Sequence, residues 1–337
     1  MKPLTIIIFI LIIISVLGTV WYFQNKQFPL PTGLKEQHES FEIQAMTSQR
    51  EILITDGTKH SIPLNEILSG GPGKDGIPSI DNPKFISVKE ATFLEDSNPG
   101  LGLTVGEESR FYPYRILVWH EIVNDTIQGQ PILVTYCPLC ATGIVFDPIV
   151  DGVPQEFGVS GRLWQSNLLM YNRAESEENE SLWSQVLGEA VLGVYTGNKL
   201  AIIRSDVVRW GDWKNAHPDT KVLSQDTGAA RNYGRDPYGD YYTSESVSFG
   251  ATFDDTRLHP KALVHGIEID GQYKAYTAEV LKTTAGEIED VFAGKNIVIT
   301  RTDSGEIRFE ADQKPLSSIP GFWFSWLAVH PETELLQ

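Results

Sequence analysis

The sequence predicts a mainly β protein, an α+β chain with few short helices, in which two degenerate β-rich halves pack into one globular unit. Three observations support this fold class. Short apolar runs alternate with turn residues from position 115 onward. A Trp-x3-His-Pro motif occurs twice, at Trp213 and at Trp326. Hydrophobic residues make up 41% and charged residues 21% of the 337 residues, a composition typical of a globular chain with a substantial core.

An apolar run occupies the amino terminus. It extends from Leu4 to Phe23 after Lys2, and at about 1.5 Å per residue it is long enough to cross roughly 30 Å of hydrocarbon as a helix. Trp21 stands near its end, where amphipathic rings favour the membrane interface. No small-x-small cleavage motif follows it, so we expect residues 1–23 to be a retained transmembrane signal anchor.

Residues 24–40 are polar and contain Pro29, Pro31 and Gly33, which predicts a linker before a β-rich domain of residues 41–337. No later segment is apolar enough to span a membrane. We therefore expect a membrane-anchored domain outside the cytoplasm, at the cell surface or in the periplasm. The 44 acidic residues outnumber the 27 Lys and Arg residues, and this charge excludes nucleic acid as a partner.

The β pattern begins with a predicted hairpin. Residues 116–123 and 132–137 form two apolar runs with turn residues between them. A second hairpin is predicted between residues 144–146 and 157–159. Residues 181–186 are expected to form one of the few short helices.

An internal repeat is expected at residues 112–225 and 259–337. The Trp-x3-His-Pro motif places His217 in the first copy and His330 in the second, and a similar hairpin pattern precedes each motif. We expect both histidines to be structural caps. Only the first copy contains cysteines, so the repeated unit does not need them in order to fold.

Cys137 and Cys140 are the only cysteines of the chain, and they flank Pro138. Two thiols at this spacing can close a redox disulfide, hold a soft metal or pack as small hydrophobic groups. Turn-forming and β residues follow Cys140, whereas a thioredoxin-type dithiol begins a helix, so the pair is closer to a metal knuckle. Zinc needs two further Cys or His ligands. Copper accepts two thiolates with one His or Met, so we expect copper ahead of zinc as the cofactor.

His120 and Met170 are the expected additional ligands. His120 interrupts the apolar run that should pair with the cysteine strand. A register with Val123 opposite Pro131 leaves His120 about 10 Å from the cysteines on the other face, whereas a shift of one residue brings them onto one face. A hydrogen-bonded core histidine is the alternative. Met170 is one of three methionines, and its alternative role is core packing.

A group of polar and aromatic residues follows the cysteines in sequence. Arginines in apolar β segments need carboxylate partners or a ligand when they are buried. The group either forms ion pairs, with Glu121, Asp125 or Glu189 as the acids, or lines a polar cleft for an anionic or sugar-like ligand. The ligand-binding candidates are Arg162, Asn167, Arg173, Trp183, Gln185, Arg231 and Tyr233.

Six short segments share a recognisable pattern. They are Ser-Gly-Gly-Pro at 69–72, His-Glu-Ile-Val-Asn-Asp at 120–125, Thr-Tyr-Cys-Pro-Leu-Cys at 135–140, Phe-Gly-Val-Ser-Gly at 157–161, Met-Tyr-Asn-Arg at 170–173 and Ser-Leu-Trp-Ser-Gln at 181–185. Together they resemble the domain of unknown function 3179 family. Ala141 stands where glycine is expected from this resemblance, and Asn172 where aspartate is expected. The resemblance implies an exported, often membrane-tethered prokaryotic protein and names no activity.

We therefore hypothesise a membrane-anchored protein whose Cys137 and Cys140 bind copper or cycle as a dithiol, with a redox or metal-transfer partner. One alternative is a cleft enzyme of hydrolase or lyase type, so whether the chain is an enzyme stays open. The other alternative is a non-catalytic binding or scaffold domain. In both alternatives the CxxC pair is a structural staple.

Overall fold

The computed structural model describes residues 50–283, 286–302 and 305–337. The mainly β prediction is confirmed, and the described part contains four short α-helices. None of the described helices is long and apolar enough to cross a membrane. The predicted anchor at 1–23 and linker at 24–40 lie outside the described residues and stay predictions.

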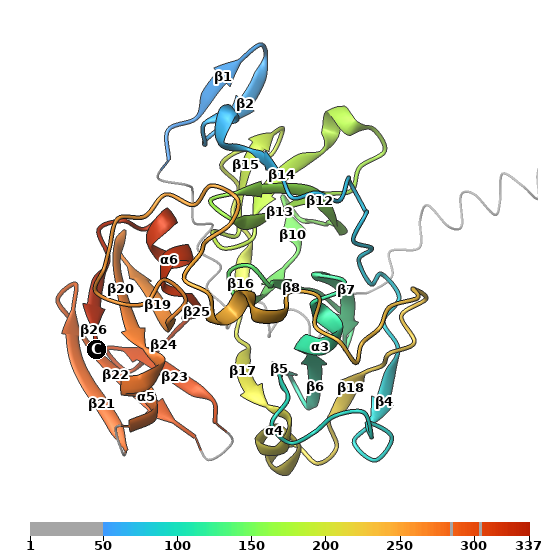
Figure 1. Cartoon of the computed structure of the whole chain (residues 1–337), viewed down its shortest axis with the longest axis vertical. Helices are drawn as coiled ribbons and strands as arrows, with labels where there is room; N and C mark the ends of the chain where they lie inside the picture. Colours follow the sequence, from blue (N-terminus) through green and yellow to red (C-terminus); the bar gives the residue numbers. More distant parts are fainter. Residues whose placement is uncertain (1–49, 284–285, 303–304) are drawn as a thin grey trace, which may run out of the picture. The chain divides into compact units, whose positions relative to one another are not determined.

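The first half of the domain contains two sheets. Its elements are β4 (Phe85–Ser87), β5 (Pro99–Val105), β6 (Glu108–Pro113), α3 (Tyr114–Leu117), β7 (Ile122–Ile127), β8 (Gln130–Cys137), β9 (Thr142–Asp147), β16 (Ala201–Ile203), β17 (Asp206–Arg209), α4 (Trp210–Ala216) and β18 (Lys221–Leu223). One sheet has the order β17-β5-β6-β18-β4 and the other β16-β9-β8-β7 (Figure 1). Strands β6 and β18 are parallel, and the other neighbours in these two sheets are antiparallel.

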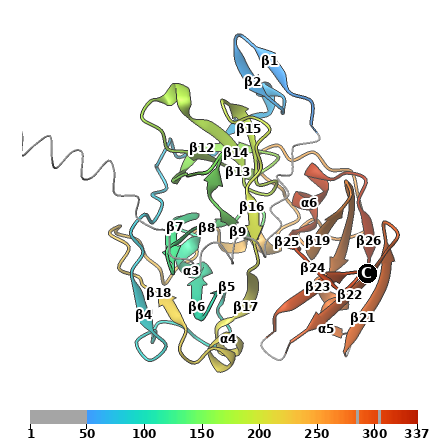
Figure 2. The same ribbon diagram turned by 180° about the vertical axis from the view of Figure 1, so that it is seen from behind.

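The second half repeats this arrangement. Its elements are β19 (Leu263–Ile269), β20 (Gln272–Thr277), α5 (Ala278–Thr283), β21 (Glu287–Phe292), β22 (Lys295–Arg301), β23 (Ile307–Ala311), β24 (Lys314–Leu316), β25 (Ile319–Phe322), α6 (Trp323–Val329) and β26 (Glu334–Leu336). The sheet orders are β25-β19-β20-β26 and β21-β22-β23-β24. Strands β20 and β26 are parallel, as β6 and β18 are in the first half. The second half is drawn in orange and red in Figure 2.

An additional sheet is inserted between β9 and β16 of the first half. Its inserted strands are β12 (Phe157–Trp164), β13 (Asn167–Asn172), β14 (Ser181–Ser184) and β15 (Glu189–Gly193), preceded by the two-stranded hairpin β10 (Ile149–Val150) and β11 (Val153–Pro154). The amino-terminal strands β1 (Leu53–Thr55), β2 (Thr58–His60) and β3 (Leu68–Ser69) complete it in the order β1-β2-β15-β14-β13-β12-β3. The second half has no such insertion between β23 and β24.

Two sequence predictions about this region are wrong. The predicted helix at 181–186 is strand β14 with its following turn, because Leu182 and Trp183 pair with β13 and β15. The predicted hairpin of 144–146 with 157–159 does not form. Its turn closes the small β10–β11 hairpin, whereas residues 144–146 pair within the first half and residues 157–159 pair with β13.

The strand predicted over residues 116–123 is also wrong in its first part. Tyr114–Leu117 is a single helical turn after Pro113, and β7 begins only at Ile122. Ile116 and Leu117 are fully buried, and a short run that is apolar on all sides does not distinguish a buried helix from a buried strand. The hairpin register differs too, since Val123 pairs with Val134.

The histidines of the repeated motif are helix caps, as predicted. His217 is the C-cap of α4 and His330 is the C-cap of α6. His217 packs on Trp213 with ring centroids 3.9 Å apart, and His330 packs on Trp326 at 4.3 Å. Burial lowers the pKa of His330 to about 3, so this ring is neutral at physiological pH.

Candidate functional site

The CxxC segment forms the turn of the β8–β9 hairpin. The amide of Cys140 donates to the Cys137 carbonyl (3.2 Å), and the amide of Ala141 donates to the Pro138 carbonyl (3.3 Å). Ala141 has a φ of 51°, a left-handed conformation that glycine adopts at lower cost, which explains why glycine suits this position. Both cysteines are free thiols, and their exposed fractions are 1% for Cys137 and 0% for Cys140.

Three other parts of the domain supply the surroundings of Cys140. Asn167, at the start of β13, donates from Nδ2 to Cys140 Sγ at 3.6 Å. Ser166, in the preceding turn, accepts from the Cys140 thiol through its carbonyl oxygen at 3.3 Å. Ser325 of α6 lies against the same thiol, and its buried hydroxyl has no oxygen or nitrogen partner among the described residues. The Cys140 carbonyl accepts from the Phe322 amide at 2.8 Å, which fixes the second half against the turn.

The two thiols differ in acidity. Burial raises the pKa of Cys137 well above its ordinary value, and its hydrogen bond to Cys140 and the charge of Cys140 add to this effect. Burial also disfavours a Cys140 thiolate, but hydrogen bonds from Cys137, Ser325 and Asn167 outweigh it and lower the pKa of Cys140. The pair therefore favours a thiolate on Cys140 and a thiol on Cys137.

A hydrogen-bond network fixes the Asn167 amide in the orientation that donates to sulfur. Asn167 Oδ1 accepts from the Val186 amide at 3.0 Å, so its NH2 group points the other way. That group donates to Gln185 Oε1 at 3.0 Å as well as to Cys140. Gln185 in turn accepts from Thr142 and donates to Thr135. The predicted candidates Asn167 and Gln185 are thus brought together with the cysteines.

Glu121 provides a carboxyl group that interacts electrostatically with Cys137 and with Cys140. It has a φ of 60°, an uncommon conformation for a residue with a side chain, and its exposed fraction is 7%. Its carboxyl forms no hydrogen bond or ion pair with a described residue. Burial raises the pKa of Glu121 well above its usual range, and the charge of Cys137 raises it further. A protonated carboxyl beside a thiol can transfer a proton.

The structure does not bring the predicted ligand His120 to the cysteines with a free nitrogen. Its Nδ1 bonds to the Pro78 carbonyl at 2.7 Å and its Nε2 to the Tyr233 hydroxyl at 2.7 Å. Met170 is fully buried in the core cluster that contains both cysteines. In the part of the chain that the structure describes, no group of three or more His, Cys, Asp or Glu residues could hold a metal ion.

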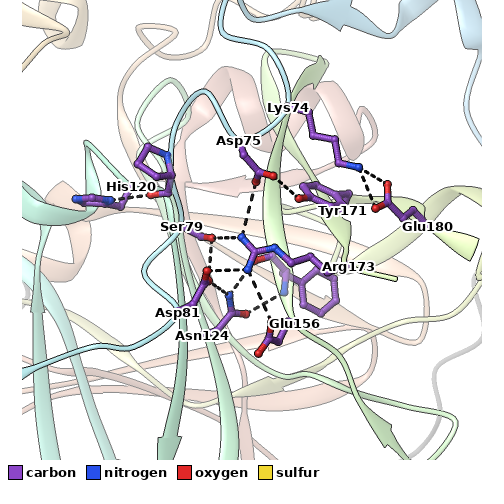
Figure 3. Close-up of polar contacts among 12 residues, drawn as sticks. Lys74, Asp75, Ser79, Asp81, His120, Asn124, Glu156, Tyr171, Arg173 and Glu180 are labelled. Atoms are coloured by element: carbon purple, nitrogen blue, oxygen red, sulfur yellow. Dashed lines mark hydrogen bonds and ion pairs between the residues drawn. The ribbon is translucent and has the colours of Figure 1, made fainter. Parts of the chain in front are cut away.

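Arg173 belongs to a separate polar network (Figure 3). Its guanidinium bonds to Asp81 and to the Ser79 hydroxyl, both at 2.7 Å, and lies 3.8 Å from Asp75. Tyr171 donates to the same Asp75 at 2.6 Å. The arginine is therefore paired, although with acids other than those considered from the sequence.

The remaining predicted ligand residues are dispersed. Arg162 is exposed, on the surface of β12. Trp183 is buried and donates to Asn172 Oδ1 at 3.1 Å. Arg231 is half-buried, and its charge contributes to a lowered pKa of His120, of which burial is the main cause.

A cleft opens between the crossover segments of the two halves. Arg204 and Ser205 connect β16 to β17, and Ser317 and Ser318 connect β24 to β25, the equivalent strands of the second half. Asp206 lies beside them with a side chain 14% exposed, 4.0 Å from Arg204. The lining residues are Gly143, Ile144, Ile202, Arg204, Ser205, Asp206, Ile307, Phe309, Pro315, Leu316, Ser317, Ser318 and Pro320.

Asp206 in this cleft should make stability depend on pH. Burial raises its pKa from 3.8 to about 6, against the opposing charge of Arg204. The native state therefore holds the proton more tightly than the unfolded chain, and the free energy of unfolding should fall as pH rises from about 4 through about 6. Asp206→Asn should raise this free energy at pH 7 by about 3 kcal/mol and flatten the fall, as measured by urea denaturation at several pH values. An exposed control, Asp226→Asn, should leave the fall intact; an unchanged profile in Asp206→Asn would contradict the assignment.

Sequence reasoning missed three residues of the dithiol site. The sequence suggests Glu121 only as an ion-pair acid, although it belongs to the His-Glu-Ile-Val-Asn-Asp segment at 120–125. No sequence pattern indicated Ser166 or Ser325. They reach the thiols only because the insertion, which contains Ser166, and α6, which contains Ser325, pack against the CxxC turn. Only the position of Glu121 beside His120 offered a sequence signal.

Comparison with known proteins places most of the chain in one family. Residues 74–316 match a family model described as a protein of unknown function, DUF3179. No curated protein and no solved structure matches the chain.

Proposed function

Because the chain belongs to the DUF3179 family, a family of unknown function, we propose a function from the chemistry of its own residues: Cys137 and Cys140 form a dithiol–disulfide redox site. The observation that supports it is the unequal environment of the two sulfurs. Asn167 donates to Cys140, whereas Cys137 interacts electrostatically with the carboxyl of Glu121. A stabilised thiolate favours the reduced pair, which makes the disulfide an oxidant.

The exchange needs a partner dithiol, which the disulfide form oxidises. A partner thiolate attacks Cys140 Sγ, the Cys137–Cys140 bond breaks, and Cys137 leaves with the electron pair. Glu121 donates its proton to Cys137, whose high pKa makes it a poor leaving group as a thiolate. The second partner thiolate then attacks its own half of the mixed disulfide and releases Cys140 as the thiolate. Two electrons pass from the partner to the pair, the partner becomes a disulfide, and solvent returns a proton to Glu121.

We place this chemistry on a membrane-anchored chain outside the cytoplasm. The support for this location is the apolar run at residues 1–23. Disulfides persist in extracytoplasmic compartments, where a partner with unpaired thiols is an expected substrate.

Equilibration of the purified chain with glutathione buffers tests the proposal. Acid quenching, alkylation and mass measurement give the fraction of Cys137–Cys140 disulfide at each potential. We expect a reduction potential of about −200 to −120 mV and oxidation of a dithiol peptide by the disulfide form. A potential below about −300 mV, with no transfer to the peptide, would identify a structural staple instead, as the cleft-enzyme and scaffold alternatives require.

A second candidate function is Cu(I) binding by the same two sulfurs. The observation that favours it is the donor set: two adjacent soft sulfurs, with Met170 in the same buried cluster, suit Cu(I) and lack the further ligands that zinc needs. Elemental analysis of anaerobically purified chain, beside a Cys137→Ser/Cys140→Ser variant, tests it. Near-stoichiometric copper that is lost in the variant is the expected result for this candidate, and equal copper in both samples would reject it.

A further inference from the structure

A tyrosine-rich segment, named here the covering segment, packs against the CxxC turn and the core cluster around it. It consists of residues 238–246 and includes the short 3-10 helix η3 (Gly239–Thr243). The Tyr241 hydroxyl donates to the Leu139 carbonyl, inside the CxxC turn, at 3.0 Å. Tyr238, Tyr241 and Tyr242 are partly buried against the core cluster that contains both cysteines. Both sulfurs are buried, so a reagent or partner reaches them only when one of the elements packed around the CxxC turn moves.

The covering segment belongs to a long irregular connection. Between the end of β18 at Leu223 and the start of β19 at Leu263, η3 is the one helix or strand that the structure describes. Connections of this length without regular structure are uncommon in a compact domain and often act as covers of functional sites. Few backbone hydrogen bonds hold such a segment, so its opening should cost less than global unfolding.

Lys261 holds the covering segment in place. Its side chain is buried, with a residue exposure of 5%. The ammonium group donates to the Tyr241 carbonyl at 2.5 Å and to the Ser246 carbonyl at 2.7 Å, and it lies 3.5 Å from the centroid of the Tyr241 ring. No described carboxylate forms an ion pair with it. The buried charge is therefore satisfied by the covering segment itself, and opening removes both hydrogen bonds together.

We infer that Lys261 is a positioning residue of the dithiol site, which holds residues 238–246 closed over Cys137 and Cys140, and that opening of this segment admits the thiol partner. The partner role rests on the proposed redox function. The closure of the segment does not depend on the redox function, because the hydrogen bonds that hold the segment form whatever the thiols react with. Access, rather than thiolate formation alone, then limits the rate at which the native pair reacts.

Alkylation of the reduced full-length chain by iodoacetamide measures this access. Mass measurement of timed samples gives the rate of modification of Cys137 and Cys140 under native conditions. Lys261→Met keeps an apolar stem of similar length but removes both donated bonds, which are charge-assisted and stronger than neutral ones. Since each 1.4 kcal/mol corresponds to a factor of ten, we expect alkylation to accelerate roughly tenfold or more. Tyr241→Phe, which loses the hydroxyl bond to Leu139 but keeps the ring, should accelerate it several-fold.

Lys274→Met is the matched control. Lys274 is equally buried, at 6% exposure, but its ammonium pairs with Asp290 in the second half, away from the covering segment. This variant should leave the alkylation rate unchanged even if it lowers stability. Rates equal to the parent in both Lys261→Met and Tyr241→Phe would overturn the inference, as would equal acceleration in Lys274→Met. Faster alkylation in Lys261→Met without any disulfide exchange would retain the inference and reject the redox function.

Discussion

Arg110→Met should lower the free energy of unfolding by about 3–5 kcal/mol, because it leaves a buried carboxylate without its cation. Arg110 and Asp125 are 7% and 9% exposed, and their side chains meet at 2.5 Å between β6 and β7. Tyr112 donates to the same carboxylate oxygen at 2.6 Å, and Arg110 also donates to the Thr126 carbonyl at 3.1 Å. The pair joins the two sheets of the first half, so its loss weakens the contact between them.

Urea denaturation followed by circular dichroism measures this effect. The control is Lys84→Met, which removes an ion pair with Asp226 whose side chains are 63% and 65% exposed. A surface pair of this kind contributes little, so this variant should change the free energy by less than about 0.5 kcal/mol. The double variant Arg110→Met/Asp125→Asn should recover part of the loss, since no unpaired charge remains. A loss in Arg110→Met no larger than that in Lys84→Met would show that the buried pair does not stabilise the fold.

The same arrangement occurs at the equivalent place in the second half. Lys274 on β20 pairs with Asp290 on β21 at 2.7 Å, as Arg110 on β6 pairs with Asp125 on β7. In each half a tyrosine two residues after the cation donates to the same carboxylate. The carboxylate also accepts from the backbone amide of the next residue in each case. A cation, a tyrosine and an aspartate thus join the two sheets of both halves.

Repeated motifs and apolar runs could be predicted from the sequence more accurately than the contacts between charged and polar side chains. The Trp-x3-His spacing identified His217 and His330, because each motif lies within one short segment, a helix of two turns with the histidine as its C-cap. The run before His120 was read as a strand because burial on all sides removes the periodicity that distinguishes helix from strand. The cation–tyrosine–aspartate arrangement was not recognised, because the aspartate lies on the next strand and the cation-x-tyrosine spacing alone is too short to stand out.

The residues of the candidate site that could be predicted are those in the first half of the chain, near the cysteines in sequence. Cys137 and Cys140 stand out because no other cysteine occurs, and Asn167 and Gln185 follow them in otherwise apolar segments whose polar residues need buried partners. Ser325 and Lys261 come from the second half and from the connection before it. Their contact with the cysteines depends on how the halves and the insertion pack, which no local pattern encodes.

Asn167→Leu should raise the pKa of Cys140 by about one to two units, because it removes a donor to the thiolate that contributes about 1.5–3 kcal/mol. Asn167 is 1% exposed, and its Nδ2 lies 3.6 Å from Cys140 Sγ. The thiolate population at a pH below the new pKa should fall roughly 10- to 100-fold. The reduced form loses the same stabilisation, so the reduction potential should become about 30–60 mV more negative. Thiolate absorbance near 240 nm against pH, with the glutathione equilibrium, measures both shifts.

Asn172→Leu separates this electrostatic effect from a loss of stability. Asn172 lies on the same strand, is also 1% exposed, and accepts from the Ser181 amide at 2.8 Å and from Trp183 at 3.1 Å. Both variants leave buried donors without a partner, so each should lose about 1–3 kcal/mol of unfolding free energy. Only Asn167→Leu removes a donor to sulfur, so only it should move the thiol titration to higher pH. The same titration curve in the two variants and the parent would mean that Asn167 supports the β12–β13 turn without stabilising a Cys140 thiolate, and the asymmetry on which the redox proposal rests would be lost.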